Sequence, residues 1–213
     1  MAGVSGSACG YYSNVGLFGG PQELRGCGQT IPPGDQGSAS PSVTLPPEGS
    51  STAVTAEDDG ALARYGPAVI FGGRSLADRS GPMKVSTRGR KSVTSSAQVK
   101  NFSAGPFVAT SVRSACSASQ AAGATGSTTV TGGVLVTKTD ADGNPSKSEK
   151  IPSRPPANFT RKGVNSVGDR FKAVFNEQKK ERDGTITVTG LHLYLLGPTA
   201  TGDVVVAQSQ ARA

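Results

Sequence analysis

A single histidine, His192, is the residue of this chain whose ordinary pKa suits proton transfer near neutral pH. It lies in the middle of the alternating segment Leu191-His192-Leu193-Tyr194-Leu195. Side chains alternate between the two faces of a strand, so His192 should point away from the face that Leu191 and Leu193 share. We therefore interpret His192 as a solvated or hydrogen-bonded structural histidine, and not as the base of a catalytic nucleophile.

A pair of carboxylates could serve glycoside hydrolysis, and Glu177 and Glu181 are the nearest candidates in the sequence. They lie among Lys179, Lys180 and Arg182, and such alternating charge is typical of a solvated turn. The chain also lacks a GxSxG elbow, an HExxH helix, a P-loop and a GxGxxG motif after a strand. We predict that the protein is not an enzyme and has neither catalytic residues nor a cofactor.

The stretch Asp140-Ala-Asp142-Gly143-Asn144-Pro145 gathers side-chain oxygens on a glycine turn. Asp140, Asp142 and Asn144 occupy the first, third and fifth positions of a calcium loop, but the glutamate that such a loop needs at its twelfth position is replaced by Ile151. Asp-Gly and Asn-Pro both favour turns. We therefore favour a hairpin turn here and keep a metal site as the alternative.

The chain has three cysteines, Cys9, Cys27 and Cys116. Cys9 and Cys27 lie in loop-rich sequence and could form a disulfide, which would leave Cys116 unpaired. One disulfide and none both remain open at this stage. There is no CxxC motif, and the lone histidine cannot complete a Cys/His zinc cluster.

Basic residues outnumber acidic ones and give a formal charge of +7. Phosphate or another polyanion could bind if these charges gather on one surface. Binding of nucleic acid is disfavoured, because the few aromatic residues lie in apolar strand patterns. The candidate polyanion-binding residues are Arg88, Arg90, Lys91, Arg161, Lys162, Lys179, Lys180 and Arg182, with Lys172 nearby in the last group.

Glycine (29) and proline (14) are abundant, which disfavours long helices. Residues 184–210 alternate apolar and polar side chains on either side of a Gly/Pro turn at 197–202, which predicts a C-terminal hairpin. We predict an all-β fold, an antiparallel β-sandwich of roughly seven to ten strands. No apolar run is long enough to span a membrane.

The chain divides by composition into two parts. Residues 1–60 predict an irregular Gly/Pro-rich N-terminal arm with one strand inside residues 10–20, and residues 61–213 predict the β-sandwich domain. Further strands are expected within 65–71, 84–100, 107–118, 127–138 and 170–178. The expected core consists of Val69, Phe71, Val112, Val130, Leu135, Phe171, Phe175, Ile186, Val188, Leu193, Leu195 and Val205 or its neighbours.

Several segments in the same order resemble the choice-of-anchor P family of secreted, β-rich actinobacterial proteins. They include GYYSNVGLFGGP, ARYGPAVIFGG, ATGSTTVTGGVL, PPANFTRKGVNSVGDRFKAVFNEQ and DGTITVTGLHLYLLGPTATGDVVVAQS. The resemblance implies an extracellular or cell-envelope domain with no assigned reaction and no catalytic residues. The chain departs from it in showing neither a signal peptide at its start nor a sorting tail at its end.

These patterns lead to two hypotheses about function. The first is a non-enzymatic secreted or cell-surface structural or interaction module, with other surface proteins or cell-wall glycan as partners and self-association through exposed strand edges. The second is an extracellular binding module for an acidic glycan or another polyanion, which would use the basic residues. Steep weakening of binding by salt would distinguish the second hypothesis from the first.

Overall fold

The computed structural model of this chain describes residues 5–20, 23–26, 42–44, 52–56, 79–80, 83–88 and 92–213. Every secondary-structure element among these residues is a β-strand, and all of the strands belong to one 15-stranded sheet. The prediction of an all-β fold is confirmed. The sheet has more strands than the seven to ten that the sequence predicts. Several of the additional strands are short and follow turns that composition alone does not resolve.

The strands in chain order are β1 (Ser5–Leu17), β2 (Glu23–Gly26), β3 (Ser42–Thr44), β4 (Thr52–Ala56), β5 (Arg79–Ser80), β6 (Met83–Arg88), β7 (Ser92–Ala104), β8 (Phe107–Ser119), β9 (Gly123–Thr131), β10 (Val134–Thr139), β11 (Pro145–Lys150), β12 (Phe159–Val164), β13 (Arg170–Lys180), β14 (Ile186–Leu196) and β15 (Ala200–Arg212).

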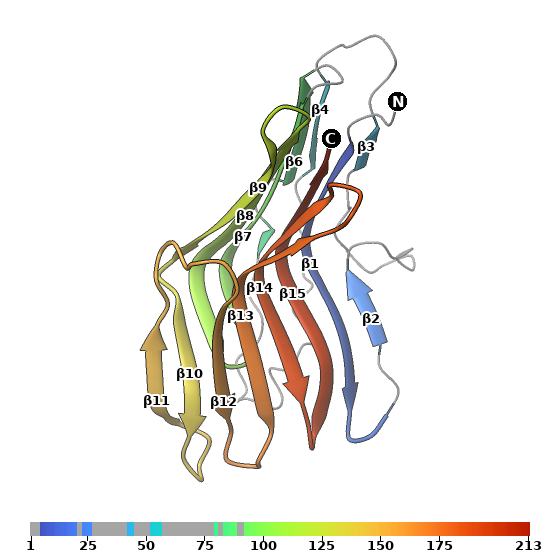
Figure 1. The fold of residues 1–213 in the computed structure, drawn as a ribbon. Coiled ribbons are helices and arrows are strands. Elements are labelled where there is room, and N and C mark those ends of the chain that lie inside the picture. The colour runs from blue at the N-terminus through green and yellow to red at the C-terminus, as the bar shows by residue number, and fades with distance from the viewer. Residues whose placement is uncertain are drawn as a thin grey trace.

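The sheet follows the order β2-β1-β15-β14-β13-β12-β10-β8-β7-β6-β4 and curls until it is nearly barrel-shaped (Figure 1). Strands β9 and β11 pair beside this path, with β8 and β10 respectively. Neighbouring strands are antiparallel except where β10 meets β12. The two stacked layers of a sandwich are not confirmed. Alternation does not distinguish the two folds, because an inward-facing residue can meet either a second sheet or the opposite wall of its own curled sheet.

Strand β1 comes from the region that the sequence marks as irregular. It pairs with β15 from Ser5 opposite Arg212 to Leu17 opposite Ala200. A strand is therefore present where one is expected within residues 10–20, and it begins earlier. Strand β4, also from the first 60 residues, pairs with β6. Residues 65–71, including Val69 and Phe71, lie outside the described part of the chain.

The core fills the inner face of the curled sheet. Phe107 and Phe175 meet edge to face there, with ring centroids 5.1 Å apart, and Phe171 is also buried. The expected core residues found buried in it are Val112, Val130, Leu135, Phe171, Phe175, Ile186, Val188, Leu193 and Leu195. From β15 the core takes Val204 and Val206, the neighbours of Val205. Val205 is buried on the opposite face, beside its pairing partner His192.

Candidate functional site

The outer face of the sheet carries a polar cluster centred on His192 of β14. The Nδ1 atom of His192 lies 2.6 Å from Glu177 Oε2, and its Nε2 atom lies 3.1 Å from Asp203 Oδ1. The Tyr194 hydroxyl donates a hydrogen bond of 2.6 Å to the other oxygen of Glu177. The rings of His192 and Tyr194 stack with their centroids 3.8 Å apart. Lys172 of β13 lies over the Tyr194 ring, with its Nζ atom 3.8 Å from the ring centroid.

A break in the side-chain alternation of β13 brings Glu177 to this face. Phe175 pairs with Leu191 and Glu177 with Thr189, so Asn176 and Gly190 are both left out of the ladder and the register does not shift. Asn176 has a φ of 52°, in the left-handed region that asparagine tolerates, and its side chain donates to Pro155 O at 2.9 Å. With unbroken alternation, Glu177 would point inward as Phe175 does. The left-handed conformation of Asn176 therefore places a carboxylate over the histidine.

The two carboxylates decide which proton state His192 holds. Burial of the imidazole lowers its pKa, but hydrogen bonds to Asp203 and Glu177 outweigh this effect and raise the pKa of His192 above its ordinary value of 6.5. Burial works against the charge of Glu177 as well, yet hydrogen bonds from His192 and Tyr194 hold the pKa of its carboxyl below 4.5. Both ring nitrogens face carboxylates, and the protonated imidazole donates to both, so in that state neither nitrogen is free to accept a substrate proton. This arrangement agrees with a structural histidine.

These opposite pKa shifts predict how the stability of the protein depends on pH. The raised pKa of His192 contributes stability that is complete below pH 6.5 and is lost as pH rises through the folded-state pKa. The lowered pKa of Glu177 contributes stability that is present above pH 4.5 and is lost as pH falls through the folded-state pKa.

We therefore expect His192→Gln to lower the free energy of unfolding most between pH 4.5 and 6.5. The difference from the parent should be about 1 to 2 kcal/mol there and should shrink above that window. Urea unfolding of the parent and the variant at a series of pH values measures this difference in the free energy of unfolding. An equal difference at every pH would show that the imidazole is neutral in the cluster.

A basic groove adjoins this cluster on the same face, with a volume of about 650 Å³. We use this name for the depression lined by five cations, Lys138 of β10, Lys147 of β11, Lys162 of β12, and Arg170 and Lys172 of β13. The carboxylate in its wall, Glu149, is already ion-paired with Arg161 at 2.7 Å. Among the described residues, no carboxylate lies within ion-pair distance of the five cations. Positive charges on one low-dielectric wall attract anions.

The structure gathers only part of the predicted polyanion-binding set. Lys162 lines the basic groove, whereas Arg161 pairs with Glu149 and stacks over the Phe159 ring at 4.0 Å. Lys179 and Lys180 lie at the opposite end of β13 from Arg170, and Arg182 lies in the turn after it. Arg88 ends β6, and Arg90 and Lys91 lie outside the described residues.

Sequence reasoning missed Lys138, Lys147 and Arg170 as members of the groove. Each is separated in the chain from the others, so no local cluster marks it. The signal that could have found some of them is side-chain alternation. Lys138 follows the buried Thr137 and Lys172 follows the buried Phe171, so both lysines face outward. Whether these cations lie close together depends on the order of the strands in the sheet, which alternation does not predict.

The Asp140 stretch forms the turn between β10 and β11. Asp140 Oδ1 accepts hydrogen bonds from the backbone N–H groups of Asp142 and Asn144, at 3.0 and 2.8 Å. The backbone of Asp140 also donates to Asn144 O at 2.9 Å. This is the bonding of an Asx-type hairpin turn. Across the described residues, no group of three or more His, Cys, Asp or Glu side chains is placed to hold a metal ion.

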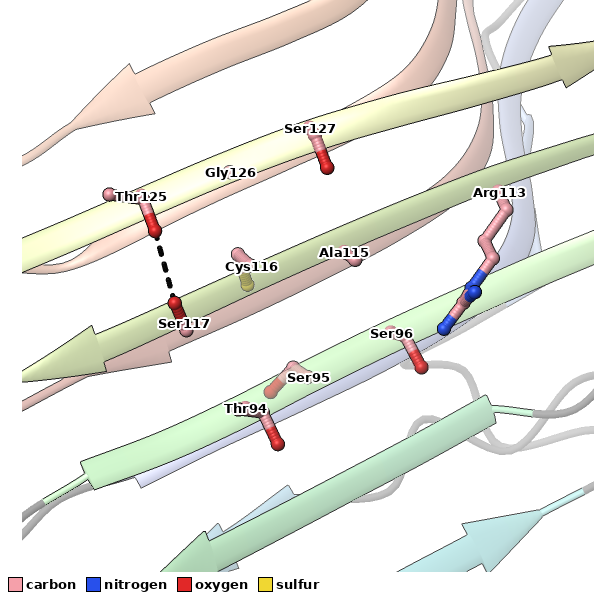
Figure 2. A pocket seen from close by; sticks show the side chains of 10 residues that line it. All are labelled: Thr94, Ser95, Ser96, Arg113, Ala115, Cys116, Ser117, Thr125, Gly126 and Ser127. Atoms are coloured by element: carbon pink, nitrogen blue, oxygen red, sulfur yellow. Dashed lines mark hydrogen bonds between the residues drawn. The ribbon is translucent and has the colours of Figure 1, made fainter. Parts of the chain in front are cut away.

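A second depression, of about 540 Å³, crosses β7, β8 and β9 (Figure 2). Hydroxyl groups dominate it, and Ser117 and Thr125 hydrogen-bond across the strands at 3.0 Å. Arg113 is its one charged lining residue. Cys116, a buried free cysteine, lies beneath it, and burial raises its pKa to about 11. The thiol therefore stays protonated and is a poor nucleophile. The depression has no chemistry comparable to the concentrated charge of the basic groove.

Cys9 is disulfide-bonded, and Cys27, which the sequence offers as a possible partner, lies outside the described residues. In the part of the chain that the structure describes, no helix has the length and apolar character of a membrane span. Comparisons with family models, with curated proteins and with solved structures find no match to this chain. The resemblance to the choice-of-anchor P family therefore stays an expectation.

Proposed function

We propose that the protein is a non-enzymatic binding module that holds a polyanion, such as an acidic glycan, in the basic groove. The observation that carries this proposal is the gathering of five cations from four strands around one depression whose carboxylate is already paired. Like charges on neighbouring strands repel one another, so this arrangement lowers stability unless an anion relieves it. The overall charge of +7 adds long-range attraction for such a ligand.

The absence of a catalytic role rests on the chemistry of the nearest titratable groups. His192 is held between Glu177 and Asp203, and the Tyr194 hydroxyl donates a hydrogen bond to Glu177. The atoms that could transfer a proton are thus hydrogen-bonded to one another, which supports a role of this cluster in shaping the groove wall. Lys172 is in turn positioned by the Tyr194 ring. The groove thus has a rigid side on β13 and β14, as a binding site requires.

Association through strand edges, the other hypothesis from the sequence, gains less support. Strand β11 pairs with β10 beside the main strand path. It begins with Pro145 and carries Lys147 and Lys150, and both residue types hinder the pairing of another strand. We therefore favour binding of a ligand through side chains of the groove. The family resemblance makes an extracellular or cell-envelope location part of the same proposal.

The test compares two double variants with the same change in net charge. Lys138→Gln/Lys162→Gln removes two exposed cations of the groove, and Lys179→Gln/Lys180→Gln removes two exposed cations at the far end of β13. We expect the groove variant to bind heparin roughly tenfold more weakly than the parent. The slope of log affinity against log salt should fall by about two. The far-end variant should change neither quantity to this extent.

Binding of heparin by both variants and the parent is measured by calorimetry over a range of salt concentrations. Equal losses in the two variants would show that the net charge matters and the groove does not. Circular dichroism and urea unfolding confirm that both variants fold, which the exposure of all four lysines favours.

A further inference from the structure

The large apolar side chains that are exposed among the described residues all lie at one end of the sheet. Phe18 is 77% exposed, Val167 62%, Leu196 51% and Val164 37%. We name these four residues the apolar tip. Phe18 follows β1, Val167 lies between β12 and β13, and Leu196 ends β14. These strands end together at the lower end of the molecule in Figure 1. Exposed apolar side chains gathered at one end of a domain are typical of an interaction surface.

Backbone hydrogen bonds hold the segments of the apolar tip together. Phe18 N–H donates to Thr199 O at 2.7 Å, which joins the turn after β1 to the turn between β14 and β15. Arg170 N–H donates to Gly197 O at 2.9 Å, and Asp169 Oδ1 accepts from Thr199 N–H at 2.5 Å. The turn that carries Val167 is thereby joined to the same point. The exposed side chains therefore project from a fixed platform.

Phe18 is held in an unfavourable state in two respects. Its φ is 52°, a left-handed conformation that is unusual for a bulky side chain. Its ring is also largely in water. Strained, exposed residues of this kind gather at functional sites, where the surrounding structure enforces them. Removal of the ring from water in a bound state would recover the hydrophobic free energy.

The apolar tip is continuous with the basic groove, because Val164 and Leu196 line the groove beside Lys162, Arg170 and Lys172. Apolar side chains at the end of a domain with cations directly behind them match a membrane surface. There the apolar groups enter the acyl boundary and the cations meet anionic headgroups. A soluble acidic glycan would engage the cations and would leave the apolar side chains in water.

We propose that the apolar tip and the basic groove together dock the protein on a bilayer that contains anionic lipids. This inference rests on the proposed function, because it names the headgroup layer as the polyanion that the groove holds. The groove is lined by five cations and one carboxylate, Glu149, which is paired with Arg161. In the neighbouring turn between β10 and β11, the Asp140 carboxylate accepts hydrogen bonds from backbone N–H groups.

The chain contains no tryptophan, so Phe18→Trp introduces a single indole probe at the apolar tip. The probe is titrated with vesicles of phosphatidylcholine alone and of phosphatidylcholine mixed with phosphatidylserine. We expect a blue shift of the emission and quenching by brominated acyl chains only with the anionic vesicles, and weaker binding as salt rises. In a vesicle sedimentation assay, Phe18→Ser/Val167→Ser should bind these vesicles at least about tenfold more weakly than the parent.

Heparin separates the failure of this inference from the failure of the proposed function. The Phe18→Ser/Val167→Ser variant should bind heparin as the parent does, and Lys138→Gln/Lys162→Gln should lose affinity for both heparin and vesicles. Unchanged indole emission with anionic vesicles, while heparin binding stays dependent on the groove, would overturn membrane docking alone. A blue shift that depends on protein concentration without lipid would overturn it in favour of a second copy of the chain. Loss of groove dependence for heparin would overturn both proposals.

Discussion

Replacement of Gly202 by alanine is expected to destabilise the protein by about 3 to 5 kcal/mol. Gly202 lies in β15, opposite Val15 of β1 on one side and Leu195 of β14 on the other. Its φ is +123°, which side chains rarely adopt, and an added Cβ would collide with the backbone oxygen of Asn14. A backbone atom cannot rotate away, so β1 would have to move from β15. Urea unfolding measures the loss as a lower midpoint at unchanged slope.

Gly143→Ala provides the matched control for this prediction. Gly143 also has a positive φ, +83°, but an added Cβ would meet nothing within 4 Å. Its replacement should therefore cost only the backbone strain, about 1 to 2 kcal/mol. If the two substitutions lower the free energy of unfolding equally, the close approach of β1 to β15 contributes nothing and the seam between them is looser than the structure indicates.

Part of the fold follows from the sequence because side-chain alternation is a local property. The orientation of His192 away from Leu191 and Leu193 follows from their adjacency in the chain, and the structure confirms it. The hairpin of β14 and β15 follows in the same way from the Gly/Pro turn between two alternating runs. The choice between a sandwich and a nearly closed sheet does not follow, because it depends on which distant strands become neighbours.

The candidate site shows the same division between local and distant information. The partner of His192 could not be predicted, because Glu177 reaches it only through the break in alternation at Asn176, whose φ is 52°, and unbroken alternation would direct Glu177 into the core. The basic groove could not be predicted as a unit either. Clustering along the chain selected Lys179 and Lys180, whereas the groove assembles single cations such as Lys138 and Arg170 from separate strands.

Asp169→Ala is expected to lower the free energy of unfolding by about 3 kcal/mol, because it removes a hydrogen-bond acceptor from a buried position. Asp169 is 1% exposed. Its Oδ1 accepts the N–H groups of Thr199 and Ala200, at 2.5 and 3.4 Å, and its Oδ2 accepts Asn165 Nδ2 at 3.4 Å. Alanine would leave the Thr199 and Ala200 amides without this acceptor. Asp169→Asn keeps one oxygen of similar shape for them, so we expect it to lose only about 1 kcal/mol. Equal losses in the two variants would show that the negative charge, and not the bond to Thr199, holds the turn.

The same substitution links the stability of the turns to the proposed docking surface. The N–H group of Thr199 donates to the side chain of Asp169, and the carbonyl oxygen of Thr199 accepts from the N–H group of Phe18. Loss of the first bond should therefore loosen the platform under Phe18, while the cations of the basic groove on β10 to β13 stay in place. We expect Asp169→Ala, at a temperature where it remains folded, to bind anionic vesicles more weakly and heparin as before. A parallel loss of both would mean that the turn supports the groove as well, and that the apolar tip has no separate role.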